Sequence, residues 1–265
     1  MRRIRKYITL LNTSTQQTLA YRSNFFMSII TTILLFISSF FLWNSVFVGK
    51  DTIAIYTWDN MKAYLLVAFI CNTLLSWYTE SAISRKILDG SISMDLIKPY
   101  NFYLARLAET LGSSLFEALV IVIASAFLVI TLRIPLPKNL LTWACFLLSV
   151  IFALTIKFGI VYLFSLLTFV TSSYMGIQWA RAAITNFLSG GLVPLIFFPD
   201  WCRKVFAYMP FQYIVSFPSS IFLNQIELSQ IGRTFLIELL WILILFLLGK
   251  LFFSVCVRKI TIYGG

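Results

Sequence analysis

Five ionisable residues fall within or beside the long apolar stretches of this sequence, and they are its best candidates for chemistry. They are Glu109, Glu117, Lys157, Arg181 and Glu238. A charged side chain at the centre of a bilayer costs about 2.5–3.5 kcal/mol on insertion scales, so each needs a partner or water. Glu117 and Lys157 have similar predicted depths on neighbouring antiparallel segments, which leaves two interpretations open: an ion pair that fixes packing, or a pathway for substrate or protons. Glu109, Arg181 and Glu238 lie nearer segment ends, from which a long side chain reaches the membrane surface.

Other kinds of reactive site are excluded by residue type. The chain has no histidine, which removes imidazole catalysis and histidine-ligated metals. The four cysteines have no metal-ligand spacing, and the aspartates all fall in loops or at segment ends. We therefore predict no catalytic residue, no metal site and no enzyme activity. No GxxxxGK[ST] phosphate loop occurs either, so ATP-driven work would need a separate ATPase subunit.

The composition places these charges in a membrane. Of 265 residues, 60% are apolar and 12% charged, whereas soluble domains are about half apolar and a quarter charged. The net charge of +11 does not form the basic, aromatic-interleaved face of a nucleic-acid-binding protein. It suits anionic lipid headgroups instead, so lipid is the expected partner and nucleic acid is not.

Hydropathy predicts an all-α integral membrane protein with one domain, residues 1–265. At about 20 residues per span, we expect six transmembrane helices at 25–48, 61–79, 104–132, 140–170, 174–197 and 234–257. Residues 1–24 show helical periodicity, with Tyr7 and Leu11 on an apolar face and Lys6 and Gln16 on a polar one. This pattern predicts an amphipathic helix lying in the membrane interface.

Two segments between the spans have their own pattern. Residues 80–100 form the longest inner loop, with a short helical pattern that Gly90 ends and a stop at Pro99. Residues 198–232 are rich in aromatics but interrupted by prolines, which predicts re-entrant short helices in the outer leaflet, supported by protein. Lysine and arginine are more numerous on the side of the inner loop, so both termini are expected in the cytoplasm. The loop near residue 172 carries no charge, so counting lysine and arginine does not indicate on which side of the membrane it lies.

Residues in both segments resemble a known family. In the inner loop the pattern is formed by Arg85, Ile87, Gly90, Ile92, Leu96, Lys98 and Pro99. In the outer segment it is formed by Ser189, Gly190, Pro194, Phe198, Pro199, Trp201, Pro210, Phe211, Tyr213 and Pro218. Together with six spans and an interfacial helix, they resemble the membrane subunits of ABC type-2 exporters. The resemblance leads us to expect a glycine shortly after Pro218 and Ile221, where this chain has Leu223 and Asn224.

The resemblance implies a function and a set of partners. It implies a permease of a bacterial ABC exporter in the plasma membrane, with two ATPase subunits that hold ATP and Mg²⁺, and a second permease chain, identical or related. Its coupling helix to the ATPase would comprise Arg85, Lys86, Ile87, Leu88, Asp89, Gly90 and Ile92. Its outer gate would comprise Pro194, Phe198, Pro199, Trp201, Pro210, Phe211 and Tyr213. The aromatic residues suit an amphipathic or hydrophobic substrate such as a drug, peptide antibiotic or lipid.

Two other classes remain open on the sequence. A gradient-driven secondary transporter or channel would use Glu109, Glu117 and Lys157 as its charge pathway. A membrane scaffold would transport nothing.

Overall fold

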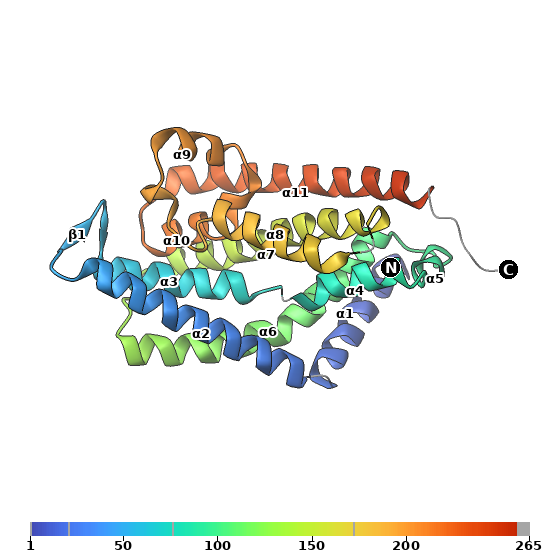
Figure 1. Ribbon diagram of the computed structural model, residues 1–265, viewed down its shortest axis with the longest axis horizontal. Coiled ribbons are helices and arrows are strands. Elements are labelled where there is room, and N and C mark those ends of the chain that lie inside the picture. Colours follow the sequence, from blue (N-terminus) through green and yellow to red (C-terminus); the bar gives the residue numbers. More distant parts are fainter. Residues whose placement is uncertain (1, 21, 76, 172, 259–265) are drawn as a thin grey trace.

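The computed structural model describes residues 2–20, 22–75, 77–171 and 173–258, and these form an almost entirely helical protein (Figure 1). The main helices are α1 (Arg2–Ala20), α2 (Arg22–Phe47), α3 (Trp58–Thr73), α4 (Trp77–Leu88), α5 (Ile92–Leu96), α6 (Phe102–Leu132), α7 (Leu140–Leu166), α8 (Tyr174–Leu188), α9 (Asp200–Ala207), α10 (Ser216–Phe222) and α11 (Leu228–Val257). Short 3-10 helices are η1 (Leu167–Phe169), η2 (Leu195–Phe197) and η3 (Pro210–Tyr213). A small antiparallel hairpin, β1 (Thr52–Ile53) and β2 (Tyr56–Thr57), joins α2 to α3.

The long helices run back and forth along the long axis of the molecule (Figure 1). The chain passes along this axis as α2, then α3 and α4, then α6, α7, α8 and α11. Helices α1 and α5 and the last turn of α11 lie at one end, which we call the inner end. The β1–β2 hairpin, α9 and α10 lie toward the other, which we call the outer end.

In the described part of the chain, four helical stretches are long and apolar enough to cross a membrane. They are Ile29–Phe47, Phe102–Leu132, Leu140–Phe169 and Ser229–Val257, and they confirm four of the predicted spans. The other two predicted spans fall on shorter helices, because α3 has 16 residues and α8 has 15. Six full membrane crossings therefore stay a prediction at these two positions.

The predicted span at 61–79 is broken. Helix α3 ends at Thr73, and Leu75 has a φ of 64°, a left-handed conformation that is strained for a leucine. Helix α4 begins at Trp77 and continues as far as Leu88, well into the segment predicted as an inner loop. The helix break between α3 and α4 leaves backbone groups that need partners from other elements.

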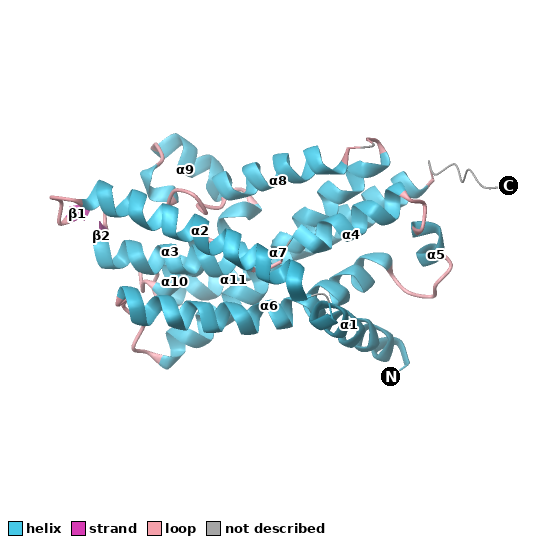
Figure 2. Ribbon diagram, turned by 60° about the horizontal axis from the view of Figure 1, so that its bottom comes forward, coloured by secondary structure: helices cyan, strands magenta, loops and turns pink. Residues whose placement is uncertain are grey.

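Helix α1 packs against the first half of α6. Ser14 Oγ donates to the carbonyl of Glu109 at 2.6 Å, and Thr15 Oγ1 donates to that of Gly112 at 2.9 Å. A Cβ atom at Gly112 would lie 2.2 Å from the carbonyl oxygen of Leu11, so only glycine permits this approach. Figure 2 shows α1 leaving the bundle at an angle to the long helices. The helix is therefore fixed to the bundle through hydroxyl groups of α1.

Helix α7 lies at the centre of the molecule and contacts most of the other long helices. Its most extensive neighbour is α11, which runs in the same direction beside it. Leu245 of α11 lies so close to Gly159 of α7 that an added Cβ would be 2.9 Å from the Leu245 Cβ. This close contact fixes the two helices relative to each other.

The chain from η2 to α10, which we call the outer segment, consists of short helices at the outer end. Phe217, Ile221 and their neighbours on α10 are buried against α3 and α7, whereas Trp201 on α9 is exposed. The tight turn after α10 contains Asn224 with a φ of 53°, a conformation that asparagine tolerates better than most residues. Asn224 thus takes the backbone conformation that a glycine would allow.

Candidate functional site

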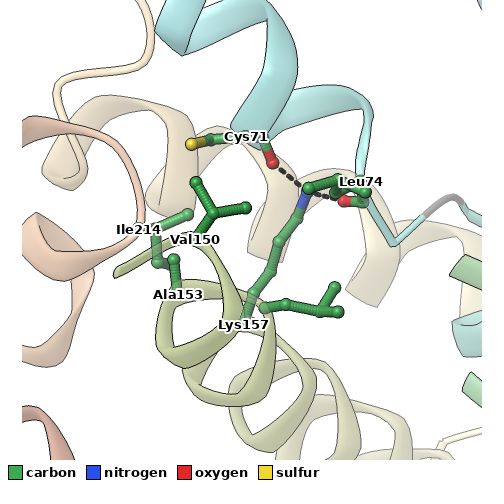
Figure 3. A pocket seen from close by; sticks show the side chains of 7 residues that line it. Cys71, Leu74, Val150, Ala153, Lys157 and Ile214 are labelled. Carbon is green, nitrogen blue, oxygen red and sulfur yellow. Dashed lines mark hydrogen bonds between the residues drawn. The ribbon is translucent and has the colours of Figure 1, made fainter. Parts of the chain in front are cut away.

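A buried lysine binds the end of α3 at the helix break. The Lys157 ammonium of α7 donates hydrogen bonds to the carbonyl oxygens of Cys71 and Asn72 at 2.9 Å, and to that of Leu74. Figure 3 shows the bonds to Cys71 and Leu74. The last carbonyls of a helix have no partner within it, and the negative end of its dipole favours a cation. Lys157 therefore stabilises the C-terminus of α3 inside the bundle.

A buried carboxylate binds the other side of the break. Glu117 Oε2 of α6 accepts a hydrogen bond from the Leu75 N–H at 3.0 Å, two residues before α4 begins. An anion is favoured near the positive N-terminal end of a helix. Glu117 and Lys157 thus lie near each other, as predicted. Both bind the same stretch of backbone, Glu117 at Leu75 and Lys157 at Cys71, Asn72 and Leu74.

The lysine also lines a small, otherwise apolar pocket (Figure 3). The lining residues are Cys71, Leu74, Val150, Ala153, Leu154, Lys157 and Ile214. Ile214 belongs to the outer segment, directly after η3. The pocket therefore brings together α3, α7 and the outer segment.

Of the three charges expected at the membrane surface, Arg181 and Glu238 are buried. Glu109 is partly exposed and pairs with Arg106 at 2.7 Å. Arg181 is buried on α8, on the same side as Gln178 and Thr185, because this face packs toward α7 and α4. Glu238 is fully buried because its face of α11 packs inward. The expectation that Arg181 and Glu238 reach the membrane surface is therefore wrong.

At the inner end, one aspartate forms ion pairs with several basic side chains. Asp95 of α5 lies 2.8 Å from the Nζ atoms of both Lys86 and Lys98 and 3.4 Å from Arg106. Tyr100 donates a hydrogen bond to the same carboxylate at 3.1 Å. Burial raises the pKa of Asp95, but the bonds from Lys86 and Lys98 and the charge of Arg106 outweigh it and hold the pKa well below its usual value. This Asp95 cluster ties α4, α5 and the start of α6 together.

Helix α1 is bound to the same region. Lys6 Nζ donates to the carbonyl oxygen of Pro99 at 3.0 Å, and the Asn101 N–H donates to the Tyr7 hydroxyl at 3.2 Å. Thr168 of η1 donates to Ser84 of α4 at 3.2 Å. The inner end is therefore a connected unit to which α1, α4, α5, α6 and η1 contribute.

The residues predicted to form the coupling helix lie on two elements separated by a turn. Arg85, Lys86, Ile87 and Leu88 form the end of α4, Asp89 and Gly90 form the turn, and Ile92 begins α5. The turn is closed by the Ser91 N–H, which donates to Asp89 Oδ1 at 2.9 Å. Hydrogen bonds from the Ser91 side chain and from this N–H lower the pKa of Asp89. Gly90 has a φ of 73°, which favours glycine.

These residues differ in what they present to a partner. Ile92 is buried among Ile83, Phe102 and Tyr162, so it anchors α5 within the protein. Leu88 is exposed, and Met94, Leu96 and Ile97, which sequence analysis did not single out as coupling residues, are exposed beside it. The exposed fraction of Ile97 reaches 81%. We call these four residues the inner apolar surface.

The residues predicted for the outer gate lie in or beside the outer segment. Pro194 and Pro199 precede η2 and α9, and Pro210 begins η3, where proline is suited to a helix start. Phe198 packs edge-on against Phe187 at 5.1 Å between ring centres. Of the remaining gate residues, Tyr213 is buried, Phe211 is partly buried and Trp201 is exposed. Their role as a gate stays a prediction.

Sequence reasoning missed Asp95 and Arg106 as site residues. Lys98 follows Asp95 by three residues, the spacing at which charges meet on one helical turn, and that was the available signal. Arg106 comes from the next helix, α6, and only the folded structure brings it close to Asp95.

Taken together, the apolar helices and the buried charges that serve broken backbone define a multi-pass membrane protein. A comparison with family models adds the family: the model described as ABC-2 family transporter protein matches residues 28–264. The chain therefore belongs to the ABC-2 transporter family, whose members are membrane components of transporters that generally work with ATPase partners. A search of curated proteins finds no match to this chain.

Proposed function

We propose that this chain is the permease subunit of a bacterial ABC exporter in the plasma membrane. Two ATPase subunits, which bind ATP and Mg²⁺, would associate with a pair of permease chains, identical or related. The chain crosses the membrane six times, with α3 and α4 together and α8 as the two shorter crossings. Both termini lie in the cytoplasm, on the side of the inner end.

The inner apolar surface is the observation that carries this proposal. Leu88, Met94, Leu96 and Ile97 are exposed at the inner end, beside a cluster of charges that would face water. Apolar residues rimmed by charge are typical of a protein-binding surface. The Asp95 cluster holds this surface rigid, so a force applied by an ATPase would be transmitted rather than absorbed.

The contacts suggest how that force travels. Arg106 links Asp95 of α5 to α6, while α4 connects the same surface to the helix break. Lys157 and Glu117 bind the two sides of the break from α7 and α6. Movement of α4 and α5 would therefore be passed to the central helices, and through Ile214 to the outer segment.

The substrate we propose is amphipathic or hydrophobic, such as a drug, a peptide antibiotic or a lipid. Aromatic side chains are concentrated around the outer segment. Trp43 stacks on Phe197 at 5.1 Å between ring centres, and Phe198 contacts both Phe187 and Phe206. Such rings bind apolar groups with large contact areas.

The test is purification of the tagged chain in mild detergent from its native host, with mass spectrometry of co-eluting proteins. We expect an ATPase bearing a GxxxxGK[ST] loop, and we expect Ile97→Asp to release it. Val48→Asp is the matched control, because Val48 is 72% exposed but follows α2 at the outer end. Retention of the ATPase by Ile97→Asp would contradict the assignment of the inner apolar surface.

The alternative is a gradient-driven transporter, favoured by the buried charges Glu117 and Lys157. Elution without an ATPase, repeated in lipid nanodiscs, would support it.

A further inference from the structure

Glu238 is a carboxyl group inside the helix bundle that the proposed coupling mechanism does not use. It lies ten residues into α11, which is about 15 Å along the helix axis at 1.5 Å per residue. Its exposed fraction is 0%, and neither carboxyl oxygen has a hydrogen-bond partner within the described part of the chain. A buried carboxyl group in this position requires an explanation.

The charge state follows from solvation. An ionised carboxylate without donors in a low-dielectric interior costs far more free energy than a neutral acid in the same place. A neutral carboxyl group still leaves polar atoms unpaired, at a cost of about 1–3 kcal/mol. A neutral, proton-carrying Glu238 is therefore the form that this environment tolerates.

The elements packed against α11 do not supply a compensating charge. These elements are α7, α6 and η3. From η3, Tyr213 is the ionisable group that interacts electrostatically with Glu238. On α7, the Lys157 ammonium is directed to the carbonyls at the helix break, and on α6 the Glu117 carboxylate binds the Leu75 N–H. No basic side chain among the described residues forms an ion pair with Glu238.

A group of aromatic rings lies toward the outer end from Glu238. Phe235 lies one helical turn nearer the outer end on the same face of α11, with ring centres 5.6 Å from Phe152 and 5.8 Å from Phe217. The Phe217 ring in turn contacts Tyr213 at 6.1 Å. We call Phe152, Tyr213, Phe217 and Phe235 the aromatic plug.

The inner side is closed differently. Toward the inner end, Leu245 fits against Gly159 so closely that the two helices have no room between them. In the aromatic plug, Tyr213 and Phe217 come from two short helices of the outer segment, η3 and α10. The outer side is therefore where a small rearrangement would expose Glu238 to water.

We propose that Glu238 is a proton-binding site, occupied in this conformation and closed to the outer solution by the aromatic plug. When the plug opens, the carboxyl O–H bond breaks and the proton passes to water, leaving a carboxylate. Closure follows the reverse transfer, in which hydronium returns a proton to one carboxyl oxygen. This site stands independently of the ATPase partner, and its test needs only the purified chain.

Infrared spectroscopy of the full chain in lipid membranes tests the charge state. We expect a protonated-carboxyl C=O band near neutral pH that is lost in Glu238→Gln. Glu227→Gln is the matched control, because Glu227 is exposed and directly precedes the same helix. A Glu238→Gln spectrum that keeps the whole band would overturn the proposal.

Hydrogen–deuterium exchange of that band in the wild-type chain tests the closure and does not require Glu238→Gln to fold. We expect slow exchange in the wild-type chain and faster exchange in Phe217→Ala. Phe187→Ala is the control, because Phe187 packs against Phe198 and Phe206, away from the plug. Equal exchange rates in Phe217→Ala and the wild type would show that the plug does not close the site.

Discussion

Lys157 and Glu117 show how charged side chains within a helix bundle can bind backbone groups. Each side chain comes from an unbroken helix and binds backbone groups that the helix break leaves without a partner. Because lipid offers no hydrogen bonds, those groups need protein partners. The two residues therefore make the break possible.

Lys157→Met is expected to destabilise the folded protein by about 3–5 kcal/mol, because it removes a buried cation and leaves its partners unsatisfied. Thermal unfolding in one detergent measures the change. Arg203→Met is the control, since Arg203 and its partner Asp200 are both exposed at the outer end and surface pairs contribute about 0–1 kcal/mol.

The double variant Lys157→Met with Glu117→Gln separates two interpretations. Each residue holds a different backbone group, so we expect no recovery of stability over the worse single variant. A double variant as stable as the wild type would instead indicate a direct charge pair. Recovery of transport in such a variant would also exclude an obligatory proton relay through both residues.

The Asp95 cluster predicts a loss of stability in acid. The folded-state pKa of Asp95 lies below its unfolded value, so its contribution is present in full above that unfolded value of about 4 and is lost as pH falls toward the folded pKa. Thermal unfolding between pH 7 and pH 3 should show this loss in the wild type.

Asp95→Asn is the matched variant for the same experiment. It is expected to lose about 3 kcal/mol at neutral pH, since Lys86 and Lys98 lose their carboxylate partner and the buried Arg106 loses one of its two. Its stability should then depend less on pH than that of the wild type. An equally steep acid loss in the variant would assign the effect to other carboxyl groups.

The attachment of α1 to α6 is a property of two whole elements. It depends on the absence of a side chain at Gly112 and on the hydroxyls of Ser14 and Thr15. These hydroxyls belong to the part of α1 that sequence analysis expected to lie in the membrane interface.

Gly112→Ala is expected to separate α1 from α6 and cost about 1–3 kcal/mol, as overpacking does. Limited proteolysis at α1, together with thermal unfolding, measures both effects. Gly232→Ala in α11 is the control, because a Cβ there meets no atom within 4 Å. Equal protease sensitivity in the two variants would mean that α1 is not held by this contact.

The sequence predicted the long helices well and the breaks poorly, for a physical reason. Long apolar runs are required wherever a helix crosses lipid, so the four longest helices coincide with predicted spans. The break at Leu75 leaves no such signal, because leucine there is as apolar as in a continuous helix. The predicted span at 174–197 likewise extends beyond Leu188, where α8 ends.

The site was predictable only in part. The similar depths of Glu117 and Lys157 followed from counting along two helices, but their backbone partners depend on a break that was not predicted. Glu238 was expected at the membrane surface because depth was judged from span ends, whereas burial depends on which helix face packs inward. Arg106 joins Asp95 only through the arrangement of α5 and α6.

For the molecule as a whole, the direction of each pass can be tested. In a cysteine-free background, single cysteines at Asp51, Lys138 and Asp200 should react with a membrane-impermeant maleimide added outside cells. Cysteines at Asp89 and Thr171 should react only after permeabilisation. These outcomes follow from six crossings with the inner end in the cytoplasm.

Thr171 is the decisive position in that experiment. It lies between η1 and α8, where the sequence has no charge to indicate orientation. Labelling of Thr171→Cys from outside would mean that α7 or α8 does not cross the membrane as proposed.

The helix break also has a consequence for biosynthesis. The carbonyls of Cys71, Asn72 and Leu74 receive their donor from Lys157, which is synthesised more than 80 residues later. Until α7 has entered the membrane, the junction of α3 and α4 lacks this donor, and lipid cannot replace it. In nascent chains that end before α7, this region should therefore stay bound to the translocon or to a chaperone. The second crossing would reach its final structure only after the fourth is inserted.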